Sequence, residues 1–224
     1  MMNFRNIISF LTQLTQNNNR EWFNSNKDKF LKVKIEFDQI VQEFIPKIHA
    51  IDSNIGALEA KDCVFRIYRD VRFSKDKNPY KIHFGAHITK DGRKSRYAGY
   101  YLHIQPGASF LAAGAYMPEP EILKEIRYEI MDNIDEFIKI TENKNFKKYF
   151  QNLEGEKLKT LPKGFPKDFK YIEFLKFKSF EISHPISDEK LYSPDIDEYL
   201  QQLVDIACPF NGFMNKVILS TIKE

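Results

Sequence analysis

The chain has 224 residues, of which 42% are apolar and 29% are charged, as is typical of soluble globular proteins. No apolar run approaches the roughly eighteen residues of a membrane helix, and the N-terminus lacks the continuous apolar block of a secretory signal. The two cysteines lie far apart in the sequence, which favours free thiols in a reducing compartment. We therefore expect a cytoplasmic protein without a membrane segment.

The net charge of +3 is unevenly distributed along the chain. Residues 66–81 carry six cationic side chains against two acids, and residues 82–96 add a further net charge of +3. The rest of the chain is therefore mildly acidic. A local excess of positive charge attracts anions, so residues 66–81 are the first candidate for a binding site.

Two helices are expected in the N-terminal part of the chain. Apolar residues recur at three- and four-residue intervals over residues 4–16, which predicts one amphipathic helix. Asparagines at positions 17–19 end this helix, and one of them can cap a second helix that runs from Arg20 to about Ile45. Pro46 should lie just beyond the end of the second helix.

From Cys63 onward the apolar period changes from 3.6 to 2. Alternating runs at 63–69, 82–88 and 100–104, and a less regular run at 109–116, predict four strands. Short turn-forming pairs, Asp91-Gly92 and Pro106-Gly107, join three of these runs, which favours an antiparallel meander.

The turn at Asp91-Gly92 constrains the strand register. A two-residue loop would set the apolar face of one strand against the polar face of the next, whereas a three-residue loop aligns the apolar faces. With that loop Gly85 lies opposite Gly99, which predicts a shallow trough. The trough is either a ligand groove or a site where a helix packs closely. Its lining residues would be His83, Gly85, Gly99, Tyr101 and His103.

The C-terminal half predicts helices from about Glu119 to Phe150, a Lys-rich loop at 152–171 and a short helix at 171–177. A strand at 179–185 and a last helix after Ser193-Pro194, with a break near Pro209, complete the chain. The expected fold is a single α+β domain over residues 1–224, in which an antiparallel β-meander sheet packs against long N-terminal and C-terminal helices.

The basic segment 66–81 can be interpreted in three ways. Guanidinium groups held by neighbouring carboxylates keep the fork geometry that binds phosphate or carboxylate at two points. The same arginines could instead form an internal salt-bridge network with Asp70 and Asp76, or the segment could be plain surface. We take anion binding as the leading interpretation. The candidate anion-binding residues are Arg66, Arg69, Arg72, Lys75, Lys77 and Lys81.

No catalytic or cofactor motif is present, so the catalytic residues are unknown and no cofactor is expected. His83 and His87 are four residues apart on a predicted strand, roughly 13 Å, which is too far to share one metal ion. No metal site is expected either.

Four segments resemble one family across nearly the whole chain. They are Arg66-Ile-Tyr-Arg-Asp-Val-Arg-Phe-Ser-Lys-Asp-Lys-Asn-Pro-Tyr-Lys81, Asn18-Asn-Arg-Glu-Trp-Phe-Asn-Ser-Asn-Lys27, Ala98-Gly-Tyr-Tyr-Leu-His-Ile-Gln-Pro-Gly107 and Leu161-Pro-Lys-Gly-Phe-Pro166. Together they resemble the conserved hypothetical proteins catalogued as domain of unknown function 2461. The resemblance implies a bacterial, soluble, single-domain protein and supplies no catalytic residues.

These observations lead to one main hypothesis and two alternatives. The main hypothesis is a protein that binds a phosphate- or carboxylate-bearing ligand, either a small molecule or nucleic acid. The first alternative is an enzyme in which His103 or His83 acts as a general base beside the arginines. The second is an interaction module whose basic segment docks an acidic partner. The sequence does not indicate the oligomeric state.

Overall fold

The structure, a computed structural model, describes residues 2–223. Its centre is a four-stranded antiparallel sheet in the order β1-β2-β3-β4. The strands are β1 (Phe84–Ile88), β2 (Gly99–Ile104), β3 (Ser109–Ala115) and β4 (Phe180–Ile186). Helices precede and follow this sheet, so the predicted α+β class with an antiparallel sheet is confirmed.

Four helices lie before the sheet in sequence: α1 (Arg5–Gln16), α2 (Arg20–Ser25), α3 (Lys27–Ile51) and α4 (Ala60–Cys63). Between β3 and β4 lie α5 (Pro120–Asp132), α6 (Ile134–Thr141), α7 (Lys144–Tyr149) and α8 (Ile172–Leu175). The chain ends with α9 (Asp188–Leu191) and α10 (Ile196–Lys223). No helix within residues 2–223 is both long enough and apolar enough to cross a membrane.

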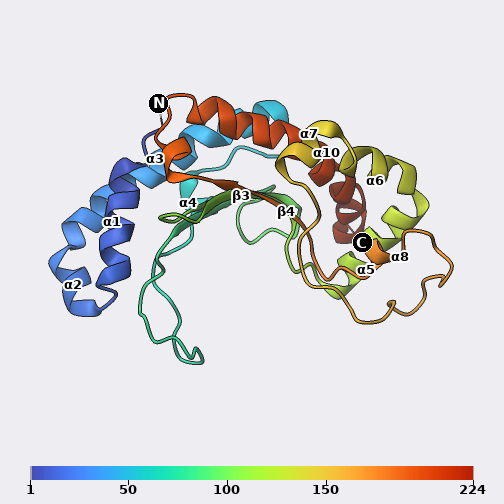
Figure 1. The fold of residues 1–224 in the computed structure, drawn as a ribbon, viewed down its shortest axis with the longest axis horizontal. Helices are drawn as coiled ribbons and strands as arrows, with labels where there is room; N and C mark the ends of the chain where they lie inside the picture. Colours follow the sequence, from blue (N-terminus) through green and yellow to red (C-terminus); the bar gives the residue numbers. More distant parts are fainter. Residues whose placement is uncertain (1, 224) are drawn as a thin grey trace.

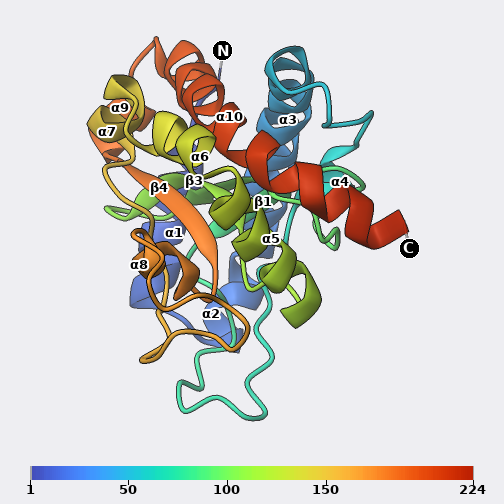
Figure 2. The ribbon, with the colours of Figure 1, turned by 90° about the vertical axis from the view of Figure 1, so that its right-hand side faces the viewer.

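The long helices α3 and α10 cover one face of the sheet (Figure 1). On β1 the ring of Phe84 packs against that of Phe37 from α3, with centroids 5.2 Å apart. On β2, Asn211 of α10 donates its amide to the Gly99 carbonyl at 3.0 Å. The alternate side chains of the strands point to the other face, which we call the open face. Residues 64–81 and 152–171 both extend on that side, as Figures 1 and 2 show.

The predicted second helix is divided, and both long helices contain a proline. Asn26 separates α2 from α3, where its side-chain amide donates to the Trp22 carbonyl at 2.9 Å. Pro46 lies inside α3 and Pro209 inside α10, so the predicted end and break at these residues were wrong. The helices continue because flanking apolar residues, such as Ile48 in α3 and Phe210 in α10, are fully buried. This burial offsets the hydrogen bond that each proline removes.

The strand predicted at 63–69 is absent from the described chain. Cys63 ends α4 instead, and the following residues make only isolated bridges, Val64 with Ala86 and Tyr68 with Tyr80. The second bridge lies within the segment itself. Residues 64–81 therefore form an irregular hairpin that pairs mainly with its own other half and not with the sheet edge.

The register of β1 and β2 differs from the prediction by four residues. Gly85 lies opposite His103 instead of Gly99, because the strands are joined by the longer connection Thr89–Ala98. A shift by an even number keeps the same side chains on the same face, so the predicted common apolar face is present. The trough formed by Gly85 and Gly99, however, was a wrong prediction.

Candidate functional site

The basic hairpin, residues 64–81, is closed by backbone hydrogen bonds between its two halves. The amide of Arg69 donates to the Pro79 carbonyl at 3.0 Å, and that of Lys81 donates to the Ile67 carbonyl at 2.8 Å. A third bond, from the Phe65 amide to Gly85 at 2.9 Å, ties the base of the hairpin to β1. The hairpin therefore has a fixed base at the edge of the sheet.

Phe23 of α2 and Asn18, in the turn between α1 and α2, also hold this base. The side chain of Asn18 donates to the Tyr80 carbonyl at 2.9 Å and accepts from the Tyr80 amide at 3.2 Å. The ring of Phe23 stacks on that of Tyr80, with centroids 3.8 Å apart, and meets Tyr68 edge-on at 5.8 Å. Two segments that are distant in the sequence thus meet at one point.

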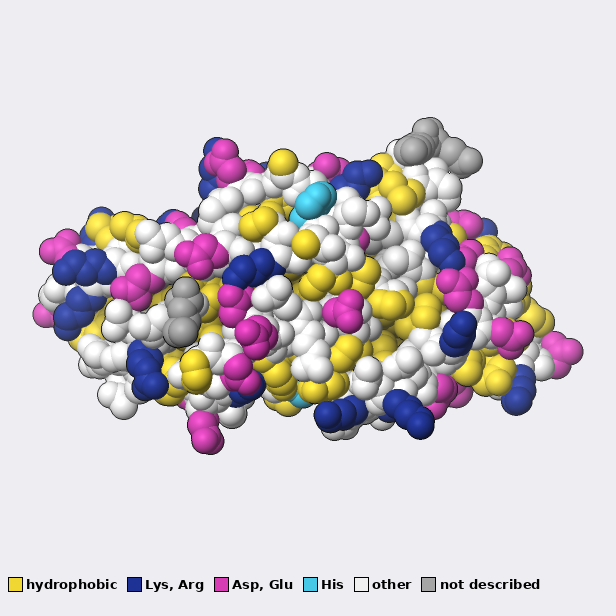
Figure 3. Space-filling view, turned by 90° about the horizontal axis from the view of Figure 1, so that it is seen from above, with side chains coloured by type: hydrophobic (Ala, Val, Ile, Leu, Met, Phe, Trp, Pro, Cys, Tyr) yellow, Lys and Arg dark blue, Asp and Glu magenta, His cyan; other side chains and the backbone are white. Residues whose placement is uncertain are grey.

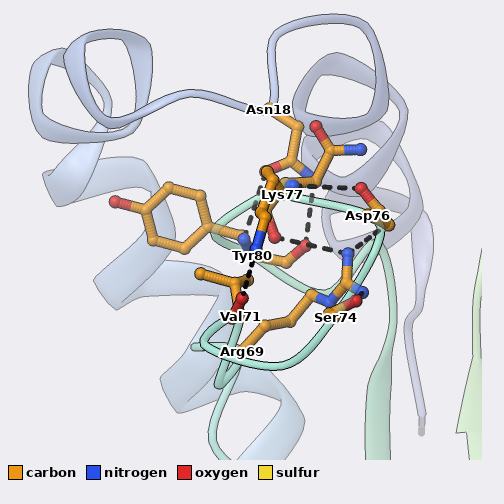
Figure 4. Close-up of polar contacts among 8 residues, drawn as sticks. Asn18, Arg69, Val71, Ser74, Asp76, Lys77 and Tyr80 are labelled. Carbon is orange, nitrogen blue, oxygen red and sulfur yellow. Dashed lines mark hydrogen bonds and ion pairs between the residues drawn. The ribbon is translucent and has the colours of Figure 1, made fainter.

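Two of the predicted anion-binding arginines are already paired inside the hairpin. Figure 4 shows Arg69 turned toward Asp76, with which it forms an ion pair, and toward Ser74 Oγ at 3.4 Å. Arg72 binds both carboxylate oxygens of Asp70, through Nε at 3.0 Å and Nη2 at 2.6 Å. The hydrogen bonds from Arg72 lower the pKa of the Asp70 carboxyl. The internal salt-bridge interpretation thus describes Arg69 and Arg72.

The remaining cations differ in their surroundings. Lys77 donates to the Val71 carbonyl at 3.1 Å, also visible in Figure 4, whereas Lys75 and Arg66 are exposed. Lys81 is half-buried, with Nζ 5.2 Å from the centroid of the Phe65 ring. Within residues 2–223 no carboxylate lies within ion-pairing distance of these last three cations. Burial, and to a smaller extent the nearby charge of Arg66, lower the pKa of Lys81.

Two imidazole rings stand beside Lys81 on the open face. The centroids of His83 and His103 are 4.2 Å apart, and the ring of Phe110 stacks on the other side of His103 at 4.5 Å. Burial lowers the pKa of His83 to about 4, with smaller contributions from His103, Lys81 and Arg69. Burial also lowers the pKa of His103. Both rings are therefore neutral at pH 7.

A short hydrogen-bonded chain fixes His103. Its Nδ1 lies 3.3 Å from the Tyr101 hydroxyl, and its Nε2 lies 3.0 Å from Gln105 Oε1. Because the Gln105 oxygen can only accept, Nε2 carries the proton and Nδ1 accepts from Tyr101. Both nitrogens of His103 are thus engaged. His83 has no hydrogen-bond partner among the residues that the structure describes.

The two glycines predicted to form a trough are instead covered by side chains. A Cβ on Gly85 would lie 2.4 Å from the Tyr101 hydroxyl, and one on Gly99 would lie 2.4 Å from the Cβ of Thr89. Each glycine thus admits a neighbouring side chain, not a ligand. His83, Tyr101 and His103 gather beside Lys81, whereas Gly99 lies apart from them and faces Gly114 of β3.

Several residues of the site were not among the predicted ones. Asn18 and Phe23 lie in one of the segments that resemble the family, so that segment was the signal that could have found them. Gln105 lies in another of these segments, residues 98–107, whereas Phe65 and Phe110 carry no such signal of their own. They are recognised only once the strands and the hairpin are placed side by side.

In the cluster of Lys81, Arg66, His83 and His103, Arg66 is exposed, Lys81 and His83 are half-buried, and His103 is buried. Cavities of about 230 and 210 Å³ lie elsewhere, the first beside α6 and α7 and the second between α1 and α3. In the described part of the chain, no three His, Cys, Asp or Glu side chains are placed to hold a metal ion. What the cluster can do chemically is attract and partly desolvate an anion.

Comparison with known proteins gives one match. The model of a family of conserved hypothetical proteins, DUF2461, matches residues 6–213. No curated protein and no solved structure matches the chain. The matched range contains both the basic hairpin and the helices that anchor it. The chain belongs to the DUF2461 family of conserved hypothetical proteins.

Proposed function

We propose that this protein binds a phosphate- or carboxylate-bearing anion beside Lys81, Arg66 and the His83–His103 pair. The observation that carries the proposal is the half-buried ammonium of Lys81, which has cationic and aromatic neighbours and no carboxylate in ion-pairing range among the described residues. Removing a charge from water is unfavourable unless the charge is paired. An anion from outside would supply the missing partner.

The surrounding residues would have distinct roles in binding. Lys81 and Arg66 would contact the anion directly, and Lys75 and Lys77 would add to the positive field. A bound anion would also favour the protonated form of His83, whose ring lies beside Lys81. Gln105 and Tyr101 would hold His103 in place through the hydrogen bonds at its two nitrogens.

The paired arginines would form an adaptable rim. The pair between Arg72 and Asp70 is exposed, with 77% and 47% of the two side chains accessible. Ion pairs at this level of exposure contribute little to stability. A ligand phosphate could therefore displace Asp70 from Arg72 without unfolding the hairpin, whose base is held independently by Asn18 and Phe23.

The geometry favours binding over general-base catalysis. Both nitrogens of His103 are already hydrogen-bonded, so this ring has no free site for a substrate proton. His83 is free, but a pKa of about 4 makes it a weak base at neutral pH. We also propose that the protein acts in the cytoplasm, because both cysteines are unpaired.

The test is isothermal titration calorimetry with inorganic phosphate and with citrate on the wild-type protein and two variants. Lys81→Met should abolish or strongly weaken binding. Lys90→Met is the matched control, because Lys90 is also half-buried and places Nζ 4.9 Å from the Tyr97 ring. Equal affinities for the two variants, or no binding of either anion to the wild type, would contradict the proposal.

A further inference from the structure

The far part of the basic hairpin carries an aromatic ring that the fold does not use. Phe73 is 95% exposed, and its ring centroid lies 5.9 Å from the guanidinium carbon of Arg72. Tyr68, nearer the base, is 45% exposed. A phenylalanine this exposed contributes no burial free energy to the fold, so its ring is accessible to a partner.

A second basic segment lies on the same side of the sheet. The Lys-rich loop, residues 152–171, has five lysines against three acids. Figures 1 and 2 both show it on the open side of the sheet, together with the basic hairpin. Four of its lysines are exposed and have no carboxylate partner within residues 2–223: Lys159, Lys163, Lys167 and Lys170.

Half-buried aromatic rings occupy the open face near the basic hairpin. Tyr101 and Phe110 have ring centroids 5.9 Å apart, and His83 continues the group through His103. The opposite, helical face has acids and bases interspersed across it, as Figure 3 shows. The two basic segments give the open side a local excess of cationic side chains, which favours a negatively charged partner there.

We propose that the anion bound at the open face is the backbone of a single-stranded nucleic acid, with one base stacked on Phe73. This inference rests on the proposed function, because Lys81 and Arg66 bind the phosphate. Cationic segments on both sides of an aromatic surface match the way proteins bind single strands without sequence preference. The strand extends from the basic hairpin toward the Lys-rich loop, across a four-stranded sheet roughly 14 Å wide.

The geometry favours a single strand over two other anionic partners, a membrane surface and a duplex. A flat membrane surface would touch the projecting residues around Phe73, whereas Lys81 and His83 lie at the sheet. A duplex keeps its bases stacked inside, so it offers no unstacked base to the Phe73 ring. A single strand can stack a base on the exposed ring and also place its phosphates beside the cations at the sheet.

Fluorescence anisotropy with a labelled oligothymidine tests this inference. Phe73→Ala should weaken binding roughly ten-fold or more, because base stacking on an aromatic ring is lost. Phe73→Trp should retain binding, since it keeps an aromatic face. The matched control is Ile35→Ala, which removes another exposed apolar side chain, 56% accessible, from α3. It should bind as the wild type does.

Salt dependence gives an independent readout of the phosphate contacts. Lys75→Glu should reduce the slope of log affinity against log salt, because each phosphate that protein cations neutralise on a single strand contributes about 0.7 to this slope. Lys32→Glu, an exposed lysine on α3, should leave the slope unchanged. Equal slopes for the two variants would contradict a role of the hairpin in phosphate binding.

The inference is overturned by oligothymidine binding that Phe73→Ala leaves intact, or by tighter binding of a duplex of the same length. It is also overturned by Phe73-dependent binding to phosphatidylserine vesicles without oligothymidine binding. If inorganic phosphate binds in a Lys81-dependent manner and oligothymidine does not bind, only the nucleic-acid inference fails. If neither binds, the proposed function fails with it.

Discussion

The side-chain amide of Asn18 pairs with both backbone groups of Tyr80, at 2.9 and 3.2 Å. This pair connects the turn between α1 and α2 to the base of the basic hairpin. A side-chain amide that bonds both groups of one residue acts as a strand neighbour would. It thereby fixes a segment that lacks regular secondary structure.

Asn18→Ala should destabilise the protein by about 1–3 kcal/mol, because it leaves both backbone groups of Tyr80 without their partner. Urea unfolding monitored by circular dichroism measures this change. Asn17→Ala is the control, since the side-chain amide of Asn17 bonds only to the Gln13 carbonyl in the last turn of α1. Equal losses for the two variants would show that Asn18 does not anchor the hairpin.

Gly114 and Gly107 should respond very differently to alanine. Gly114 has a φ of 127°, and a Cβ there would lie 2.0 Å from the carbonyl oxygen of Phe180 on β4. Gly107 has a φ of 67° and open space around it. We expect Gly114→Ala to cost more than about 3 kcal/mol and Gly107→Ala about 1 kcal/mol. Thermal unfolding that ranks the two variants equally would contradict the close approach of β3 and β4.

Acid should weaken the fold through His83. Its folded-state pKa of about 4 lies below the ordinary value of 6.5, so between these values the unfolded chain binds more protons. Stability is therefore fully present above pH 6.5 and falls as the pH drops toward 4, by on the order of 2 kcal/mol.

Urea unfolding over this pH range, compared between the wild type and His83→Gln, measures the effect. The variant should show a flatter dependence of unfolding free energy on pH. The depressed pKa of His103 acts in the same direction, so part of the slope should remain. Parallel curves for the two proteins would exclude His83 as a source of the acid sensitivity.

Most helices and strands could be predicted from the sequence because their apolar side chains recur at regular intervals. The alternation over 100–104 and the apolar residues of 179–185 correspond to β2 and β4 almost residue for residue. The same rule failed at 63–69. Alternation indicates that a segment is extended, but it does not identify the segment with which it pairs.

The register could not be predicted for a related reason. Alternation with a period of two excludes register shifts by an odd number of residues, because only those turn the side chains to the other face. The observed pairing of Gly85 with His103 differs from the predicted one by an even number of residues, which leaves the faces unchanged. Tertiary contacts hold the longer connection: the amide of Arg93 donates to the carbonyl of Asp62 in α4 at 2.9 Å. The sequence of residues 89–98 alone does not indicate this contact.

The candidate site was predictable as a region but not as an arrangement. Six cations in one segment indicated where an anion would be attracted. Arg69 and Arg72 have an internal carboxylate partner, whereas Lys81 has none among the described residues. This difference depends on how the hairpin folds. The contact of His83 with His103 followed from the shifted register.

The central claim is that an external anion is the counter-ion of Lys81, and the pKa of His83 reports it most directly. Histidine NMR titrations with and without inorganic phosphate measure this value. We predict that phosphate raises the pKa of His83 in the wild-type protein and has no effect on it in Lys81→Met, because a bound anion stabilises the imidazolium. A wild-type pKa that phosphate leaves unchanged would contradict the claim.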